Sequence, residues 1–510
     1  MKLTLVSPPR FYWPFVSEDD NWLLPQSLAC LGGYARSKGH DVKILDCQPI
    51  QMGWQSLKDE IERDRPDVVA VGENHALYAS EALKVVDLVR SVDKNIKVVL
   101  GGSHFSNMIR QTLDQKDVDA MVLGEGEVTL TALLDHWSNG GGDLDGVDGV
   151  AFKRDGKVVR TKPRTLIPDL STLPMPAYDL MPMEHYGKGK YLFSPGGMTM
   201  HHSRGCVSRC SFCGWWTQMA DVEIDADDKV HYTPRWRNKT VQQTVDEIDL
   251  VYHKYKKRCL VFVDESWNMD PRWNEAFAEE VLSRDLSELH WFAFMRADAL
   301  VRDERKGILS KLVRSGLCHL CVGVERAEDP ELKDFEKGFY NGKLVRDAFG
   351  ILKNKYPGVF RQATFIVGIR DETEKSMMSQ VKLAKELDLD YPGFHPITPI
   401  PGTAIWDQAI SEGWIEEADF NKFDWMTPVM PSKYLSRDEI SYLLYKMNKK
   451  YVNLRWLMRG LLSRKKYKRH MYVWWVIVAA RVAVGSLKQS LFRWRHDAYT
   501  VLQKPAWYDA

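Results

Sequence analysis

Residues 204–216 read RGCVSRCSFCGWW and place three cysteines, Cys206, Cys210 and Cys213, within eight positions. Three thiolates on one loop can hold three irons of a four-iron cluster and leave the fourth iron open. An open metal position is where a substrate or cosubstrate binds, as in catalytic zinc sites. The alternative is a zinc site with a distant fourth ligand. The spacing favours the iron–sulfur cluster, in a reducing compartment.

The chain around this loop alternates between strand and helix patterns. Six short apolar runs separated by helix-length stretches predict a partial (β/α)6 barrel of the TIM type over residues 197–405, with its chemistry at the carboxyl ends of the strands. The runs cover residues 199–205, 259–265, 290–297, 319–326, 362–369 and 393–400.

The first 140 residues show a second alternation. Near-continuous apolar strands separated by helices predict an α/β domain with a doubly wound, Rossmann-like parallel sheet, which binds ligands beyond the carboxyl ends of its strands. The N-terminal stretch is typical of a first strand and not of a signal peptide. The residues expected at those ends are Ser7, Pro8, Asp46, Glu73, Asn74, Gly101, Gly102, Ser103, Gly124, Glu125 and Gly126.

Length and composition fit this organisation. A chain of 510 residues predicts two to four domains, and 44% hydrophobic with 27% charged residues excludes disordered, collagenous and disulfide-scaffold proteins. Residues 141–196, rich in glycine and proline, predict a linker with a hairpin. Residues 406–510 predict a helical C-terminal domain with a basic, apolar tail.

The net charge of +1 hides an asymmetry: residues 441–496 contain 14 Lys or Arg and no Asp or Glu. Within them, residues 471–480 read MYVWWVIVAA, which is too short to span a bilayer. Basic residues and tryptophans around an apolar run predict peripheral contact with an anionic membrane. The alternative is a helix that packs on the rest of the chain, because residues 1–440 contain 55 Lys or Arg against 67 Asp or Glu and are therefore acidic. A nucleic-acid track is not expected, because the run interrupts the basic residues.

The cysteine motif resembles that of the radical S-adenosylmethionine (SAM) superfamily, CxxxCxΦC with an aromatic residue before the last cysteine, and the resemblance covers roughly residues 197–405. It implies that the open iron chelates SAM, which is cleaved to a 5′-deoxyadenosyl radical with an electron from a flavodoxin- or ferredoxin-type donor. Asp264 and Glu265 stand where the family has a GGE-like stretch, although the glycines are missing here. The implied SAM-contacting residues are Phe212, Asp264, Glu265, Arg296, Gly323, Glu325 and Gly368.

A doubly wound domain directly before such a barrel resembles the cobalamin-binding subclass of this superfamily. The strand-end residues of the first domain would then contact cobalamin, and glycines such as Gly101 and Gly102 would let it approach the backbone. The DxHxxG motif, which supplies a cobalt ligand in some cobalamin proteins, is absent, and neither His75 nor His104 stands in that context. We therefore expect no axial histidine from this domain. The alternative is a vestigial domain without a cofactor.

The two resemblances predict a methyltransferase that acts on an unactivated carbon of an apolar substrate, such as a lipid, isoprenoid, tetrapyrrole or natural product. An oxidative cyclase resembling the anaerobic magnesium-protoporphyrin monomethyl ester cyclases is one alternative, a methylthiotransferase-like enzyme without cobalamin is another, and a non-catalytic cobalamin sensor or scaffold is a third. The predicted location is cytoplasmic, with membrane association on the cytoplasmic face. Further candidates for the cavity wall are His201, His202, Trp215, Trp216, Tyr232, Trp267 and His395.

Overall fold

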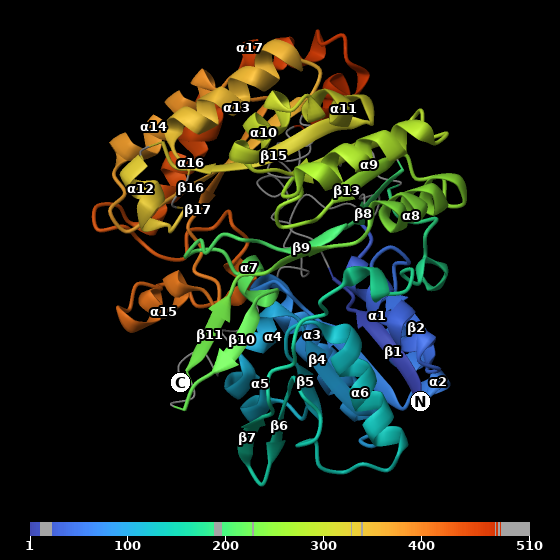
Figure 1. Cartoon of the computed structure of the whole chain (residues 1–510). Helices are drawn as coiled ribbons and strands as arrows, with labels where there is room; N and C mark the ends of the chain where they lie inside the picture. Colours follow the sequence, from blue (N-terminus) through green and yellow to red (C-terminus); the bar gives the residue numbers. More distant parts are fainter. Residues whose placement is uncertain are drawn as a thin grey trace.

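The computed structural model describes residues 1–10, 23–187, 196–226, 229–327, 329–337, 340–474, 476–477 and 480. Two mostly parallel sheets dominate it, one formed by the N-terminal residues and drawn in blue, the other by the green-to-orange middle of the chain (Figure 1). The two sheets lie one above the other, with their carboxyl edges turned toward the space between them. This arrangement gives the chain one shared interior surface.

The first sheet has five parallel strands in the order β2-β1-β3-β4-β5. Alternate residues of each strand enter different cores: Val69 and Val71 face the core formed with α2 and α3, whereas Val68 and Ala70 face the core formed with α1 and α6. Helices therefore cover both faces, which confirms the predicted doubly wound domain. The strands are β1 Lys2–Ser7, β2 Asp41–Asp46, β3 Val68–Gly72, β4 Lys97–Gly101 and β5 Ala120–Val122; the helices are α1 Gln26–Ser37, α2 Trp54–Asp64, η1 Ala76–Tyr78, α3 Ala79–Val92, α4 Ser103–Asn107, α5 Ile109–Gln115 and α6 Gly126–Ser138.

The hairpin that we placed in a linker belongs to this sheet. Strand β6 (Val150–Arg154) pairs antiparallel with β5, and β7 (Lys157–Arg160) pairs antiparallel with β6. The sheet therefore continues past residue 140 through an antiparallel edge. The connector that follows contains only two short turns of helix, η2 Leu170–Thr172 and η3 Tyr178–Leu180.

The second sheet consists of six parallel strands in chain order, β8-β13-β14-β15-β16-β17. Its first and last strands, β8 and β17, do not pair with each other, so the barrel is open, as predicted. The six strands are β8 Gly197–Met200, β13 Cys259–Phe262, β14 His290–Phe294, β15 Leu317–Glu325, β16 Phe360–Val367 and β17 Tyr391–Pro396.

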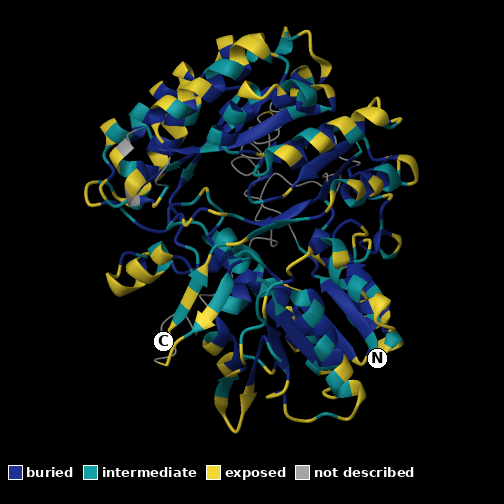
Figure 2. Ribbon diagram, in the orientation of Figure 1, coloured by how far each residue is buried: buried dark blue, intermediate teal, exposed yellow. Residues whose placement is uncertain are grey.

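Helices cover the outer side of this sheet, and their exposed residues face away from it (Figure 2). Two small antiparallel pairs, β9 with β12 and β10 with β11, follow the first strand of the barrel. The remaining elements are β9 Ser203–Gly205, α7 Trp215–Gln218, β10 Asp221–Ile224, β11 Val230–Thr233, β12 Trp236–Asn238, α8 Val241–His253, α9 Pro271–Ser283, α10 Ala297–Arg305, α11 Ile308–Arg314, α12 Asp329–Asp334, α13 Gly342–Lys355 and α14 Glu374–Glu386.

Beyond the barrel the chain is helical, as expected, with α15 Ala404–Ser411, η4 Phe420–Lys422, α16 Arg437–Tyr451 and α17 Leu454–Leu461. Part of the basic tail packs on the barrel through Asp390. The buried Lys468 lies 2.8 Å from this carboxylate and the Tyr472 hydroxyl donates to it at 2.9 Å. No helix within the described ranges combines the length and apolarity needed to cross a membrane.

Candidate active site between the two sheets

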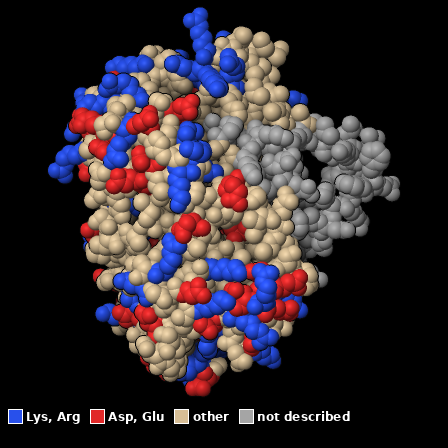
Figure 3. Space-filling view, turned by 90° about the vertical axis from the view of Figure 1, so that its right-hand side faces the viewer, with Lys and Arg blue, Asp and Glu red and all other residues tan. Residues whose placement is uncertain are grey.

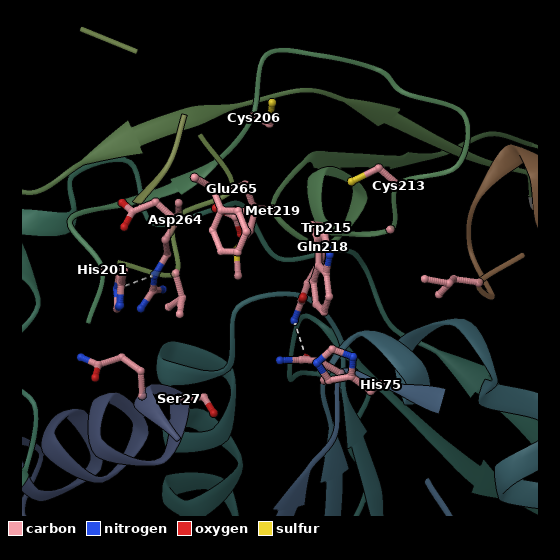
Figure 4. Close-up of a pocket in the computed structure, with 18 of the residues that line it drawn as sticks. Ser27, His75, His201, Cys206, Cys213, Trp215, Gln218, Met219, Asp264 and Glu265 are labelled. Carbon is pink, nitrogen blue, oxygen red and sulfur yellow. Dashed lines mark hydrogen bonds between the residues drawn. The ribbon is translucent and has the colours of Figure 1, made fainter. Parts of the chain in front are cut away.

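A cavity of about 980 Å³ lies between the two sheets and is lined by residues of both domains. Both folds place ligands at the carboxyl ends of their parallel strands, and here the two sets of strand ends face each other. Figure 4 shows Cys206, Cys213 and Glu265 on the barrel side, above Ser27 and His75 of the first domain. A ligand bound here would therefore contact both domains.

All three cysteines of the motif line this cavity. The Cys206 sulfur lies 3.4 Å from the Ser266 hydroxyl and accepts the Ser208 amide at 3.4 Å. Burial raises the pKa of Cys210 to about 11 and that of Cys213 to about 12. Burial therefore keeps these two thiols protonated, and a metal centre that bound them would have to ionise them. The three residues fit a four-iron cluster on the barrel side.

The zinc alternative is not supported. Among the described residues, no group of three His, Cys, Asp or Glu is close enough to hold a single metal ion. Cys318 and Cys321 also have a two-residue spacing, but both lie within β15, so their side chains point to opposite faces of that strand. Cys318 and Cys321 therefore do not form a second pair of cysteine ligands on one face.

Two buried carboxyl groups follow β13 at the edge of the cavity. Asp264 accepts hydrogen bonds from the His202 and Ser203 amides at 3.1 and 2.6 Å, whereas Glu265 accepts the Gly205 amide at 2.9 Å. Burial raises the pKa of each carboxyl to about 7. Asp264 thus fixes the start of the cysteine loop, while Glu265 has a second oxygen to offer to a cationic group such as the SAM amino group.

The other residues implied for SAM divide into two groups. Phe212, Arg296, Gly323 and Glu325 line the cavity, but Gly368 does not. The Gly368 amide donates to the buried Glu372 at 3.0 Å. Arg326 donates to that carboxylate at 2.6 Å, so this stretch is occupied by the internal structure of the barrel.

The structure adds a lysine beside this group. Lys337 Nζ donates to the Gly323 carbonyl at 2.7 Å and to Glu325 at 2.9 Å, inside the cavity. Arg296, in turn, donates to the Ser208 hydroxyl within the cysteine loop at 2.6 Å. Charged groups from three strand ends therefore surround the predicted cluster.

The strand-end residues of the first domain also divide. Asn74, Gly101, Gly102, Gly124, Glu125 and Gly126 line the cavity, whereas Ser7, Pro8, Asp46, Glu73 and Ser103 do not. Asp46 instead accepts the Tyr186 hydroxyl at 2.6 Å, and Glu73 accepts the amides of Asn74 and His75. Among the described residues, Tyr186 of the connector thus covers Asp46 at the end of β2.

The edge that remains open suits a large ligand. Gly102 has φ of +92°, and an added Cβ would lie 2.4 Å from the Glu73 carbonyl, so only glycine fits. At Gly124 a Cβ would meet no protein atom within 4 Å and would instead enter the cavity. An apolar slot continues along the face of the sheet beside α1 and α6, lined by Leu5, Leu28, Ala70, Val99 and Leu130. A bare backbone edge with a deep slot fits the ring and nucleotide tail of cobalamin.

A buried ion network joins the two domains beside the cavity. Arg204, two residues before the first cysteine, donates to Glu125 at 2.9 Å and to Glu127 at 2.5 Å, at the start of α6. Arg237 also donates to Glu125, at 2.9 Å. Although burial alone would raise the pKa of Glu127, Arg204 holds it below its usual value. The network fixes the cysteine loop relative to the glycine edge.

Of the further candidates for the cavity wall, His201, Trp215 and His395 line it. The remaining four do not. His202 is fully buried and stacks on Trp273 at 3.8 Å, and Trp267 is also fully buried. Trp216 donates from its ring to the Cys210 carbonyl, and Tyr232 lines a smaller neighbouring pocket.

Sequence reasoning missed several lining residues. Gln26, Ser27 and Cys30 reach the cavity from the start of α1, Met219 follows α7, and Trp425 comes from the C-terminal region. The only signal for the first three is that α1 follows β1, because the helix after the first strand of such a fold begins at the ligand edge.

Comparison with known proteins agrees with this division of the chain. Residues 18–134 match the B12 binding domain, and residues 200–384 match the radical SAM superfamily. An uncharacterized methyltransferase of Pyrococcus horikoshii is 29% identical over 452 residues, covering 88% of this chain and 91% of the relative. The anaerobic magnesium-protoporphyrin IX monomethyl ester cyclase of Rubrivivax gelatinosus is 28% identical, covering 85% and 75%.

Solved structures show the same fold. The cobalamin-dependent radical enzyme OxsB matches with a TM-score of 0.70 at 17% identity, covering 96% of this chain and 72% of that one. The methyltransferase TsrM from Kitasatospora setae matches with a TM-score of 0.69 at 17% identity, covering 94% and 99%. The chain therefore combines a B12-binding domain with a radical SAM domain that carries the intact cysteine triad.

Proposed function

We propose that the protein transfers a methyl group to an unactivated carbon of an apolar small molecule, in a reaction that uses a four-iron cluster, SAM and cobalamin. The observation that carries this proposal is the single cavity with the cysteine loop on one wall and the glycine edge of the B12-binding domain on the other. The P. horikoshii relative and the hopanoid C-3 methylase of Methylococcus capsulatus are both named for methyl transfer, which supports the same reaction.

The cofactors, when bound, supply a radical that removes hydrogen from carbon and a methyl group that can be transferred; the protein supplies position and water exclusion. Cys206, Cys210 and Cys213 would hold the cluster, leaving one iron for SAM. Glu265 would accept a hydrogen bond from the SAM amino group. The Arg204 network would keep the two cofactor sites at a fixed separation.

The wall of the cavity favours an apolar substrate. Phe212, Phe294, Ile366, Ile397 and Trp425 present carbon atoms to the space beside the cysteine loop. The polar residues of the cavity wall include His201, whose pKa burial lowers well below its usual value, with Lys239 and Arg204 adding to the effect. A neutral imidazole beside an apolar wall would orient a substrate that carries one hydrogen-bonding group.

Methyl-deuterated SAM tests the reaction. The anaerobically reconstituted protein, with cob(I)alamin and a reductant, should form deuterated methylcobalamin and S-adenosylhomocysteine, and a low-potential donor should then release 5′-deoxyadenosine. Cys213→Ala should lose the 5′-deoxyadenosine. If the protein carries a full cluster and bound cobalamin but forms neither methylcobalamin nor 5′-deoxyadenosine, the enzyme proposal fails. That result would support the alternative of a non-catalytic sensor or scaffold. SAM cleavage by protein that never binds cobalamin would instead support the methylthiotransferase-like alternative.

The cyclase relative supports one alternative reaction, ring formation on a tetrapyrrole. Cyclisation forms a carbon–carbon bond within the substrate, so no deuterium enters the product. Mass spectrometry of products formed from an apolar extract of the source cells therefore separates the two reactions. A product that carries the label supports methyl transfer, whereas an unlabelled product that has lost hydrogen supports cyclisation.

Radical SAM chemistry needs an external electron donor, and we propose a flavodoxin or ferredoxin. We also propose that the outward face of the C-terminal helices contacts an anionic membrane, where an apolar substrate would be met. Leu454 and Leu462 are each 73% exposed and stand at the two ends of α17. Each lies about one helical turn from the exposed Met458, and the two are about two turns apart. Lys and Arg side chains stand out at the upper end of the molecule in Figure 3, where α17 lies in Figure 1.

Flotation with anionic vesicles tests the membrane contact. Leu454→Glu combined with Leu462→Glu should abolish flotation of the full chain, because it removes apolar area and adds negative charge. Met426→Glu is the matched control, since Met426 is also exposed, at 61%, but lies outside the tail. Equal flotation of all three proteins would contradict the membrane contact.

A further inference from the structure

The part of the cavity that extends into the barrel has a glutamine at its floor. Along β16 the alternating residues Gln362, Thr364 and Ile366 line the cavity, and Gln362 lies farthest from the carboxyl end of the strand. On the neighbouring strand Cys321 lines the cavity at the same level, because it is the partner of Gln362 in the sheet register. Gln362 therefore lies deeper in the barrel than the strand ends that surround the cysteine loop.

The surroundings of this glutamine are apolar. Val261, Phe292 and Cys321 form a small buried cluster on the inner side of the sheet, and Leu23 of the first domain packs against it. A polar side chain beside such a cluster costs free energy unless it finds hydrogen-bond partners. The partners of Gln362 therefore decide what the floor of the cavity can bind.

The amide oxygen of Gln362 is held from below by a buried histidine. Gln362 Oε1 lies 2.8 Å from His319 Nε2, and His319 Nδ1 lies 3.1 Å from the hydroxyl of Tyr467 in the C-terminal tail. The His319 ring is fully buried between Phe292 and Phe360, each at a centroid distance of 4.7 Å. Burial lowers the pKa of His319 to about 3, so this ring is neutral.

A neutral ring fixes the direction of both hydrogen bonds. An amide oxygen only accepts, so Nε2 of His319 carries the ring proton and donates to Gln362. Nδ1 then has the lone pair and accepts the Tyr467 hydroxyl. With its oxygen held in this way, Gln362 has its NH₂ group left over, and among the described residues no group accepts a hydrogen bond from that nitrogen. The floor therefore presents a hydrogen-bond donor to the cavity.

The tail that supplies Tyr467 is anchored on the barrel. The next residue, Lys468, pairs with the buried Asp390 at 2.8 Å, and Tyr472 donates to the same carboxylate at 2.9 Å. These contacts hold the Tyr467 hydroxyl against His319, near the start of β15. The orientation of the floor amide therefore depends on the C-terminal tail.

We propose that Gln362 binds the substrate by donating a hydrogen bond from its amide nitrogen to an acceptor oxygen, and that His319 and Tyr467 are positioning residues that hold this amide. The inference rests on the proposed function and narrows its substrate class to apolar molecules that carry an oxygen, such as that of a carbonyl or carboxylate group. A purely hydrocarbon end would leave the donor unpaired, and a site built to form a hydrogen bond rejects a molecule that lacks the matching group.

Titration of the enzyme with an extract tests the proposal. The full chain, loaded with the cluster and cobalamin, is given methyl-deuterated SAM and increasing amounts of the apolar extract of the source cells. The exact mass of the labelled product should correspond to a composition with at least one oxygen. With Gln362→Met, which keeps the length of the side chain but cannot donate, the amount of extract needed for half-maximal labelling should rise about tenfold. A pure hydrocarbon product would overturn the proposal.

Gln362→Glu tests the direction of the hydrogen bond. A protonated carboxyl can donate, whereas a carboxylate only accepts, so this variant should approach the wild-type half-maximal amount at low pH and depart from it as the pH rises. Burial keeps the neighbouring titratable groups of His319, Cys321 and Tyr391 neutral around pH 7, so they do not add to this dependence. The opposite pH dependence, relative to wild type at each pH, would show that the substrate presents a donor, and the proposal would fail.

Two further variants separate this role from a general effect on folding. Tyr467→Phe, outside the cavity, should cause a smaller rise in the half-maximal amount, because His319 loses the partner of its Nδ1. Gln380→Met is the matched control, since Gln380 is a buried glutamine on α14 that does not line the cavity, and it should cause no rise. Iron and cobalamin contents show that each variant is loaded.

The two levels of the argument fail in different ways. If the wild-type protein forms labelled product and Gln362→Met does so at the same amount of extract, this inference fails and the proposed function stands. If the loaded wild-type protein forms no labelled methylcobalamin, the proposed function fails, and this inference fails with it.

Discussion

The carboxyl edges of the two sheets face the same cavity but are built from opposite kinds of residue. The first edge presents glycines, among them Gly101, Gly102 and Gly124, with few side chains between them. The second presents thiols and charges, including Cys206, Glu265 and Lys337. A bare edge admits a large ligand that brings its own chemistry, whereas a charged edge binds a cluster and a small zwitterion. The difference fits the proposed arrangement, in which the first sheet holds cobalamin, the second holds the cluster and SAM, and the substrate lies between them.

The largest effect should come from removing one thiol of the charged edge. Cys213→Ala leaves a cluster with two protein ligands, so we expect iron content to fall and SAM cleavage to drop to background. Cys47→Ala, in the core of the first domain, should leave both unchanged. Iron analysis and quantification of 5′-deoxyadenosine measure the outcome, and a Cys213→Ala protein that retains SAM cleavage would contradict the role of the cysteine triad.

The next largest effect should come from the buried Arg204 ion network, which joins the two edges. Arg204→Met leaves Glu125 and Glu127 buried without their main partner, and removing one member of a buried ion pair costs about 3–5 kcal/mol of unfolding free energy. The control is Arg154→Met, because Arg154 pairs with Asp143 and Asp145 at the solvent-exposed surface, where the loss of an ion pair should change the unfolding free energy little. Urea unfolding compares them; equal losses would show that the bridge does not hold the domains.

A smaller effect should distinguish glycines of the bare edge that the fold requires from glycines that leave space for a ligand. Gly102→Ala should destabilise the protein by about 1–3 kcal/mol, because the new Cβ meets the Glu73 carbonyl at a positive φ. Gly124 also has a positive φ, of +74°, so Gly124→Ala should cost about 1–2 kcal/mol of backbone strain alone. Its methyl group meets no protein atom within 4 Å but enters the cavity, where it should weaken cobalamin binding. Thermal melting and cobalamin absorbance measure the two effects; normal cobalamin binding by Gly124→Ala would place the corrin elsewhere.

The sequence alone predicts both sheets, because their strands are near-continuous apolar runs separated by helix-length stretches, a pattern typical of parallel sheets. It also locates the cysteine loop by its spacing, and it locates the glycines that line the cavity, Gly101, Gly102, Gly124 and Gly126, by their place after the predicted strands. It fails where distant segments cover a strand end: Asp46 looks like a ligand residue until Tyr186, 140 positions later, donates to it. Lys337 and Gln26 were missed for the complementary reason, since nothing in their local sequence shows that tertiary contacts turn them toward the cavity.

The smallest effect should come from Asp46, at the end of the first sheet that Tyr186 of the connector covers. Burial raises the pKa of Asp46 to about 6, even though Tyr186 and Ser7 donate hydrogen bonds to it. A carboxyl whose pKa is higher in the folded than in the unfolded chain binds protons more tightly when folded, so its contribution to stability falls as the pH rises from about 4 to about 6. Between pH 5 and pH 8 this loss is about 1 kcal/mol.

Asp46→Asn should therefore remove about 1 kcal/mol of the stability difference between pH 5 and pH 8, since an amide does not titrate. Urea midpoints at the two pH values measure it. Asp41→Asn, at the exposed start of the same strand, controls for the change in net charge. An unchanged pH dependence in Asp46→Asn would show that this carboxyl is hydrated and reachable from solvent, and the outer end of the first sheet would then be open to a ligand after all, like the glycine edge beside it.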